Sequence, residues 1–321
     1  MGKLIYNLED FQKAAVQYRG DLLRMPIEGL EKTLQYMTLR PGITYEQIVG
    51  TITASAELAP YKAGRRSDVT LDAVLRPLRT YFGSVNADFE PNAEISTLLG
   101  HRASQAMGDA LATTPQAYEV LANVAKSVSG KLNGAIWTAK RDDAGTTTAT
   151  LFNGFDTITD DEVNAGKIST GNGNLLELGE AITPANAVDV AKQILYSLSD
   201  ELRDEQCYLF CSRDFADKYN EGYRLTHAGI NYYNEYNQTV VEGSEGNLIL
   251  APMSAKKNSK YFQVSPKRNM LVGCDQMSDA ESVRVKEYAP DVLTFMLRMF
   301  FGVQFESIDA KRFKAIKLFS E

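Results

Sequence analysis

The sequence predicts an α+β fold, in which helices and strands occupy largely separate stretches of the chain. Three observations predict it. Residues 115–137 repeat apolar side chains at helical spacing over about six turns. From residue 283 onward, the chain is dominated by strand-like alternation. Residues 61–97 also alternate, but they contain too few bulky apolar side chains to form a core of their own.

The first 60 residues predict a mainly helical and loosely organised segment. Residues 10–18 are one short helix candidate. Pro26 is expected to open a second helix at 27–37, because proline suits the first turn of a helix. A Pro-Gly pair ends that helix, and residues 45–58 are expected to form a third piece of this segment.

Residues 61–97 predict a long, thin pair of strands. Residues 69–75 alternate apolar and polar side chains, residues 78–82 continue the extended pattern, and a Gly-Ser turn follows. Between residues 62 and 79 there are five basic and two acidic side chains, a local charge of +3. Such a strand pair is expected to lie on an acidic neighbour. The alternative is an ordinary hairpin exposed to solvent.

Residues 115–137 predict the longest helix. Thr114 can cap its N-terminus, and Pro115 suits its first turn. At 1.5 Å per residue the helix spans roughly 34 Å. Gly130 and Gly134 weaken its last turns by about 1 kcal/mol each relative to alanine, and they permit close approach of another backbone.

The chain after this helix predicts two strand-like runs, at 146–152 and 155–159, and then a polar connection over 160–180. A Gly-Asn-Gly-Asn sequence at 171–174 is not a phosphate loop, because no Lys-Ser/Thr pair follows it.

Residues 181–280 predict alternating helices and strands. A second long helix starts at Thr183, a buried strand covers 207–211, and Ser212 caps a short helix after that strand. Residues 221–246 are rich in Tyr, Asn and Gly and predict an extended loop. Further strands are expected at 247–252, 261–264 and 270–273, with a polar turn at 255–260.

The end of the chain predicts one long buried strand and one short one. Residues 293–301 are apolar on both faces, which is typical of a strand covered on both sides. Residues 313–318 form the last strand-like run.

The composition argues against several functions. The formal net charge of −7 is the wrong sign for a protein that binds nucleic acid tightly by neutralising phosphates. No apolar run approaches the roughly 18 residues that a membrane helix needs, and the N-terminus lacks the apolar centre of a signal peptide. Three cysteines in so long a chain do not predict a disulfide framework, which fits folding in a reducing cytoplasm.

No motif predicts catalysis or a cofactor. Neither His101 nor His227 lies in a hydrolase or metalloprotease pattern, and no Cys or His pair has metal-ligand spacing. We therefore expect no enzyme activity, no cofactor and no metal. An enzyme whose site is assembled only in space remains the alternative of another class.

The order of these elements resembles the major capsid proteins of tailed bacteriophages, which have the Hong Kong 97-like fold. Short strings add to the resemblance: 148–155 is similar to the strand after that family's long helix, and 207–212 to its buried strand before a short helix. The resemblance implies five parts. These are an N-terminal arm at 1–60, an E-loop hairpin at 61–97, a peripheral domain at 98–180 with its spine helix at 115–137, an axial domain at 181–280, and return strands of the peripheral domain at 281–321.

The resemblance also implies a function. The chain would assemble with copies of itself into hexamers and pentamers of an icosahedral head that encloses double-stranded DNA without sequence preference. Scaffolding, portal or decoration proteins are further expected partners, and the location is the virion after assembly in the bacterial host cytoplasm. The expected E-loop contacts are Arg65, Arg66, Arg76, Arg79 and Tyr81, and the expected contacts around the capsomer axis are Tyr232, Tyr233, Tyr236, Lys256 and Lys257.

The same fold also builds encapsulin compartments, which hold cargo enzymes. The sequence separates a phage head from such a compartment poorly, so both interpretations stay open at this point.

Overall fold

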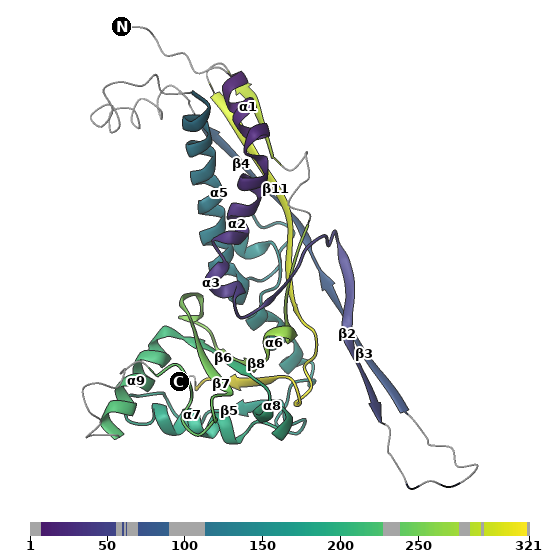
Figure 1. The fold of residues 1–321 in the computed structure, drawn as a ribbon, viewed down its shortest axis with the longest axis vertical. Coiled ribbons are helices and arrows are strands. Elements are labelled where there is room, and N and C mark those ends of the chain that lie inside the picture. Colours follow the sequence, from purple (N-terminus) through teal and green to yellow (C-terminus); the bar gives the residue numbers. More distant parts are fainter. Residues whose placement is uncertain are drawn as a thin grey trace.

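A computed structural model shows the chain as a long upper part, a compact lower part and a projecting hairpin (Figure 1). The residues that the structure describes are 8–55, 60, 62, 70–89, 113–226, 238–275, 283–289 and 292–319.

The upper part is built on the long strand β11 (Val292–Phe305). Its first half lies between β10 (Val283–Ala289) and β4 (Tyr81–Phe89), and its last residues pair with β9 (Met270–Cys274). The short strand β1 (Thr38–Arg40) runs parallel to β9 at the edge of this sheet. The predicted long strand is thus confirmed.

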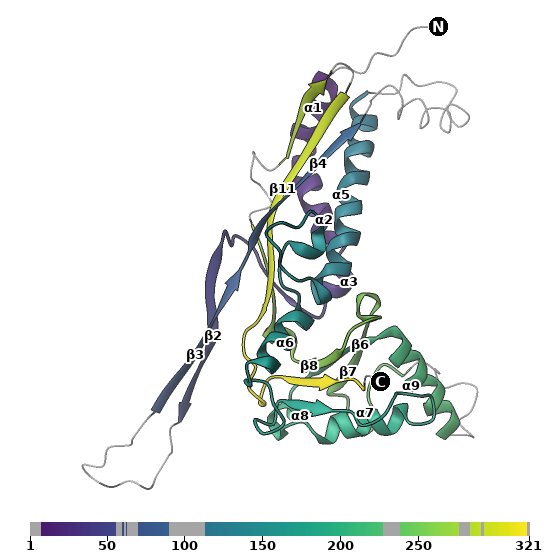
Figure 2. The same ribbon diagram turned by 180° about the vertical axis from the view of Figure 1, so that it is seen from behind.

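Three helices cover one face of the upper sheet (Figure 2). They are α1 (Leu8–Gln17), α2 (Arg19–Glu28) and α5 (Thr113–Thr138), and the short helix α3 (Glu31–Leu34) follows α2. The apolar stripe predicted for 115–137 is the stripe of α5 that faces the sheet, where Leu121 packs with Phe11, Leu22 and Phe295 in one buried cluster.

The lower part is a second sheet, in the order β5-β12-β8-β6-β7. Its strands are β5 (Leu175–Glu177), β12 (Lys314–Lys317), β8 (Tyr261–Ser265), β6 (Cys207–Ser212) and β7 (Leu248–Met253). Helices α7 (Ala187–Tyr196), α8 (Asp200–Asp204) and α9 (Arg213–Thr226) belong to this part. The predicted cap is present, since Ser212 Oγ accepts a hydrogen bond from the Phe215 backbone N–H at 3.2 Å. The closing strand joins this lower sheet, whereas the sequence interpretation placed it with the upper one.

Two predictions for the first 60 residues are wrong. Pro26 lies in the last turn of α2 rather than opening a helix, a position where its missing N–H costs a single hydrogen bond. Residues 45–58 were expected to be helical, but Glu46–Ser55 is strand β2. This segment is rich in β-branched side chains, which favour a strand.

The strand pairing also differs from the prediction. Strand β2 pairs with β3 (Thr70–Arg79) in a two-stranded antiparallel hairpin that projects from the upper part (Figure 1). Residues 81–89 were expected to continue that hairpin, but they form β4 and pair with β11 over nine residues. Thr80 is buried at the junction and donates its backbone N–H to the Tyr45 carbonyl, so the chain passes directly from hairpin to sheet.

The two strand-like runs predicted at 146–152 and 155–159 are also wrong. The chain forms a 3-10 turn at Thr148–Thr150 and then helix α6 (Phe155–Asn164). Gly154 explains the tight passage between α5 and α6, because a Cβ there would lie 2.4 Å from the Trp137 carbonyl oxygen. Phe155 and Ile158 are then buried on one face of α6 at helical spacing.

Candidate assembly surface

The hairpin carries one continuous apolar face. In an antiparallel pair, directly opposed residues project to the same side, and successive residues along each strand alternate between the two sides. Every second residue of β2, together with its partner on β3, therefore belongs to one face. We call this set the apolar face: Ile48, Gly50, Ile52, Ala54, Leu71, Ala73, Leu75 and Pro77. Four of its side chains are largely exposed: Ile48 at 66%, Ile52 at 71%, Leu71 at 68% and Leu75 at 61%.

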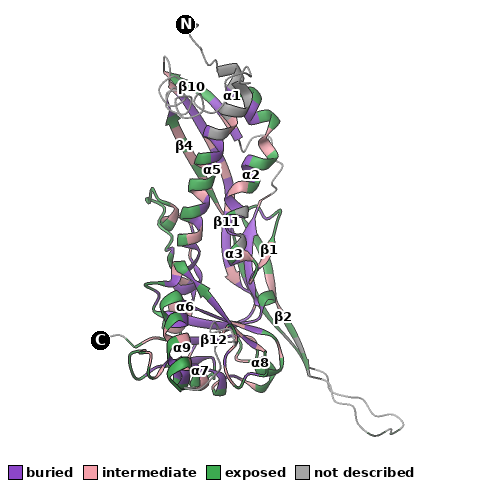
Figure 3. Ribbon diagram, turned by 60° about the vertical axis from the view of Figure 1, so that its left-hand side comes forward, coloured by how far each residue is buried: buried purple, intermediate pink, exposed green. Residues whose placement is uncertain are grey.

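The opposite face of the hairpin is more polar and partly used by the chain itself. Away from the root it carries Thr51 and its partner Val74. At the root, Leu78 is fully buried in a small cluster against which Val49 packs. The chain therefore covers the opposite face at its root and leaves the apolar face open. The described residues of β2 are exposed or intermediate in Figure 3.

A row of exposed apolar side chains on one face is typical of an interaction site. Soluble monomers rarely expose large contiguous apolar patches, and a ribbon of two strands that faces water on both sides normally carries polar residues on each. The pattern on β2 and β3 therefore favours coverage of the apolar face by another polypeptide.

An ion pair anchors the hairpin to the body. The Arg76 guanidinium donates to Glu162 of α6 at 2.7 Å and to the Gln304 side-chain oxygen of β11 at 3.2 Å. The Arg76 and Glu162 side chains are only 9% and 14% exposed, and Lys167 Nζ lies 3.2 Å from the other oxygen of Glu162. Arg76 was expected to contact a neighbouring subunit. In the structure its guanidinium is buried and paired within the chain, and a contact with a neighbouring subunit stays a prediction.

The other predicted E-loop residues fall in three places. Arg79 is exposed and paired with Glu46 at 3.1 Å at the root of the hairpin. Tyr81 is half-buried, and the Arg141 guanidinium lies 3.8 Å from its ring centre. Arg65 and Arg66 lie outside the described residues.

Lys256 was expected to contact other subunits around the capsomer axis, a contact that stays a prediction, and the structure gives this residue partners within the chain. It is 1% exposed, and its ammonium donates to Asp156 at 2.7 Å and to Gln263 at 2.6 Å. The ammonium also lies 4.1 Å from the Trp137 ring centre. Burial lowers the pKa of Lys256, while the Asp156 carboxylate opposes that shift. Lys256 therefore ties the end of α5 to the lower part of the chain.

The remaining axial residues are only partly placed. Lys257 is exposed beside the buried Lys256. Tyr232, Tyr233 and Tyr236 lie outside the described residues.

Within the described part of the chain, no group of three or more His, Cys, Asp or Glu side chains has the arrangement of a metal site. No helix among these residues has the length and apolar character needed to cross a membrane.

The residues that matter most on this surface were missed by sequence reasoning. Ile48 and Ile52 alternate at a strand period of two, but the segment was interpreted as helical. Glu162 and Gln304 carry no local signal, because their role depends on the fold bringing α6 and β11 to the root of the hairpin.

Comparison with known proteins identifies the fold. No family model matches the chain, and no curated protein sequence matches it. Among solved structures, the chain is similar to one from the satellite phage P4 procapsid that includes the size determination protein Sid. That similarity has a TM-score of 0.58 at 11% identity and covers 92% of this chain and 89% of the other. A second is from the capsid of cyanophage A-1(L), with a TM-score of 0.54, 12% identity, and coverage of 93% and 94%.

The chain thus has the α+β fold of phage capsid chains, over nearly its whole length. The expected fold is confirmed.

Proposed function

We propose that the chain is the major capsid protein of a tailed bacteriophage and assembles with copies of itself into hexamers and pentamers of an icosahedral head. The observation that carries this proposal is the exposed apolar face of the hairpin, with Ile48, Ile52, Leu71 and Leu75 each more than 60% exposed. A second copy of the chain offers the partner that this surface requires.

The fold supports the same proposal. The P4 procapsid and cyanophage capsid chains share the arrangement of this protein along almost its entire length. Both come from phage particles, which favours a phage head over a cargo compartment as the assembled form. Two of the buried charged side chains among the described residues, Lys256 and Asp156, pair with each other, which is consistent with a structural role.

In this proposal the projecting hairpin is the E-loop, with its strands at 46–55 and 70–79, and the helix α5 is the spine of the peripheral domain. The lower sheet with α7 and α9 corresponds to the axial domain. Packaged DNA is enclosed without specific contacts, which suits a chain of net charge −7. Scaffolding, portal and decoration proteins are further partners, and the shell assembles in the host cytoplasm.

Expression of the full chain followed by negative-stain microscopy and sedimentation velocity tests the proposal. The expected result is closed shells, or capsomers of five and six copies, whose abundance rises with protein concentration. A species that sediments as a 35.5 kDa monomer at all concentrations, with no particles on the grid, contradicts the proposal.

A further inference from the structure

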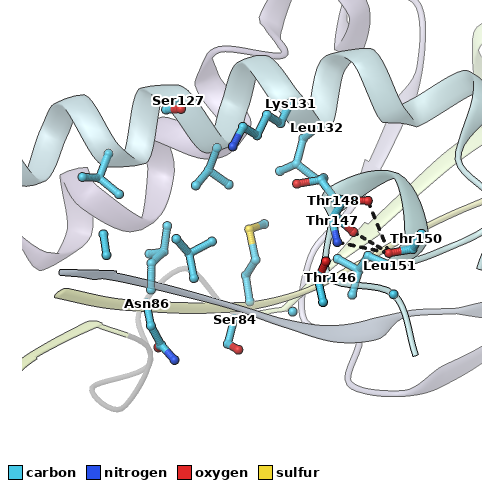
Figure 4. A pocket seen from close by; sticks show the side chains of 18 of the residues that line it. Ser84, Asn86, Ser127, Lys131, Leu132, Thr146, Thr147, Thr148, Thr150 and Leu151 are labelled. Atoms are coloured by element: carbon cyan, nitrogen blue, oxygen red, sulfur yellow. Dashed lines mark hydrogen bonds between the residues drawn. The ribbon is translucent and has the colours of Figure 1, made fainter. Parts of the chain in front are cut away.

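The upper sheet has a second face, on the side opposite the three helices (Figure 2). Along β11, Leu297 and Met299 are buried beneath the helices, whereas Arg298 between them is only partly buried. Strand β4 alternates in the same way, and Ser84 and Asn86 point away from α5 (Figure 4). We call this second side the open face. The strand register assigns to it Phe82, Ser84, Asn86, Asp88, Arg284, Lys286, Thr294, Met296, Arg298 and Phe300.

An exposed aromatic cluster lies at one end of the open face. The ring centre of Phe300 lies 5.1 Å from that of Tyr45 and 5.0 Å from that of Phe82. Tyr45 is 72% exposed and Phe82 is 54% exposed. Tyr45 also has a backbone φ of 76°, a strained conformation for a bulky residue, and strained residues cluster at functional sites. The cluster therefore has the exposure of a contact surface rather than that of a core.

Basic side chains occupy the rest of the open face. Arg298 lies on β11, and Arg284 and Lys286 lie on the neighbouring β10. Among the strand residues assigned to this face, Asp88 is the one acid, and its carboxylate accepts a hydrogen bond from Thr294. Three cations and one carboxylate give these residues a charge of +2, in a chain of net charge −7.

The composition of the open face is that of a protein interface. Aromatic residues, Met and Arg are enriched at the centres of interfaces, whereas a sheet face that meets only water is mostly polar. Here Arg298 lies between Met296 and Phe300 on β11, and Phe82 lies directly opposite Phe300 on β4. A segment that combines carboxylates with an apolar side chain complements such a surface, because carboxylates pair with guanidinium and ammonium groups.

A second copy of this chain is a poor match for the open face. Its hairpin is basic, with a charge of +3 between residues 62 and 79, so like charges would meet. Several of its exposed carboxylates, including those of Asp143, Asp214 and Glu201, are already paired with cations of their own chain. The charges therefore favour a partner outside this chain.

We propose that the open face binds an acidic segment of a protein other than this chain. The carboxylates of the segment pair with Arg298 and Lys286, and an apolar side chain packs on Phe82 beside Tyr45. Strand β4 is nine residues long, about 30 Å at roughly 3.3 Å per residue, so a segment of about nine residues spans the face. The inference goes beyond the proposed function, since it concerns a second protein rather than the contacts between copies.

A synthetic peptide tests the chemistry of this surface. The probe is a fluorescent peptide of about nine residues in which glutamates flank a central phenylalanine, and the control peptide has lysine in place of each glutamate. Fluorescence anisotropy measures binding to the full chain. The acidic peptide is expected to bind, more weakly as the salt concentration rises, and the basic peptide is expected not to bind. Equal binding of the two peptides, or no binding of the acidic one, overturns the inference.

Charge reversals locate the binding surface. Arg298→Glu is expected to weaken binding of the acidic peptide about tenfold, which is about 1.4 kcal/mol. Lys286→Glu, at an exposed position, makes the same test without disturbing a partly buried side chain. Lys126→Glu is the matched control, because Lys126 is exposed on α5 at the other side of the sheet, and its affinity is expected to stay unchanged. An unchanged affinity in both open-face variants contradicts the assignment.

Disulfide trapping gives the position independently of charge. Ser84 and Ser127 are both exposed, but Ser84 points away from α5 whereas Ser127 lies on α5 and lines the pocket between this helix and β4 (Figure 4). An acidic peptide that ends in cysteine is expected to form a disulfide with Ser84→Cys and not with Ser127→Cys. The native cysteines of the chain are buried. Trapping by Ser127→Cys alone places the peptide in the pocket and overturns the inference.

The same titration on assembled particles separates this inference from the proposed function. Unmodified particles that do not bind the acidic peptide show that a second copy already covers the open face, which overturns the inference and leaves the proposed function standing. Failure of the chain to assemble overturns the proposed function alone, and the titration of the free chain then decides the inference.

Discussion

The apolar face of the hairpin predicts a large assembly defect from two small substitutions. Ile48 and Ile52 are 66% and 71% exposed, so replacing both by threonine removes few packing contacts within the isolated chain. Threonine is also β-branched, so the strand propensity of β2 is kept. The change is therefore directed at the contact between copies.

The magnitude follows from the carbon atoms that are lost. Each Ile→Thr substitution removes the equivalent of two carbons from the apolar side chain, at about 0.8 kcal/mol per buried carbon, or about 1.5 kcal/mol per residue. Two substitutions cost about 3 kcal/mol for each hairpin contact. At about 1.4 kcal/mol per tenfold, the association of subunits weakens roughly a hundredfold.

Sedimentation velocity over a range of concentrations measures this effect as the concentration at which half of the protein is assembled. Val74→Thr is the matched control, because Val74 lies on the opposite face of the same hairpin and is 53% exposed. The double variant is expected to raise the half-assembly concentration roughly a hundredfold at unchanged thermal stability, and the control is expected to leave it unchanged. Equal effects from both variants, or normal assembly of the double variant, contradict a role of the apolar face in the contact between copies.

Three further predictions concern the chain itself. Glu162→Gln removes the charge that pairs with the buried arginine of the hairpin, and faster hydrogen exchange in β2 and β3 is expected, with exchange in β8 as the internal control. Asp156→Asn leaves the Lys256 ammonium buried without its carboxylate, and urea titration is expected to show a loss of about 3–5 kcal/mol in the free energy of unfolding; a loss below 1 kcal/mol contradicts the ion pair. Burial raises the pKa of Cys207 and of Cys211 to about 12, above the 9.0 of a free thiol. The unfolded thiols ionise first, so the free energy of unfolding is expected to fall as pH rises from 9 toward 12, and a double Cys→Ala variant should fall less steeply.

Much of the fold follows from periodicity in the sequence. The long helix at 115–137 and the strand at 293–301 have apolar patterns long enough to be assigned from local residues. The buried strand at 207–211 and the cap at Ser212 are likewise local signals.

The errors arise where contacts distant in sequence decide the structure. Residues 46–55 became a strand because residues 70–79 pair with them, and residues 81–89 left the hairpin because β11 offers nine partners. The segment after Gly154 became a helix because it packs beside the end of α5. None of these partners is visible in a local window.

The candidate surface differs in chemistry from the one that the sequence predicted. Sequence reasoning expected a strand pair that lies on another copy through basic residues. The structure instead exposes an apolar face, and it buries Arg76 and Lys256 in ion pairs within the chain. The residues next to a basic side chain in sequence give no sign that an acid distant in sequence will pair with it.

The central claim is that the apolar face of the hairpin is covered by another copy of this chain. Cryo-electron microscopy of the assembled particle tests it most directly. The expected result is a shell in which each hairpin lies against a neighbouring copy, with Ile48 and Ile52, exposed in the single chain, buried between two copies. A shell in which both side chains remain open to solvent contradicts it.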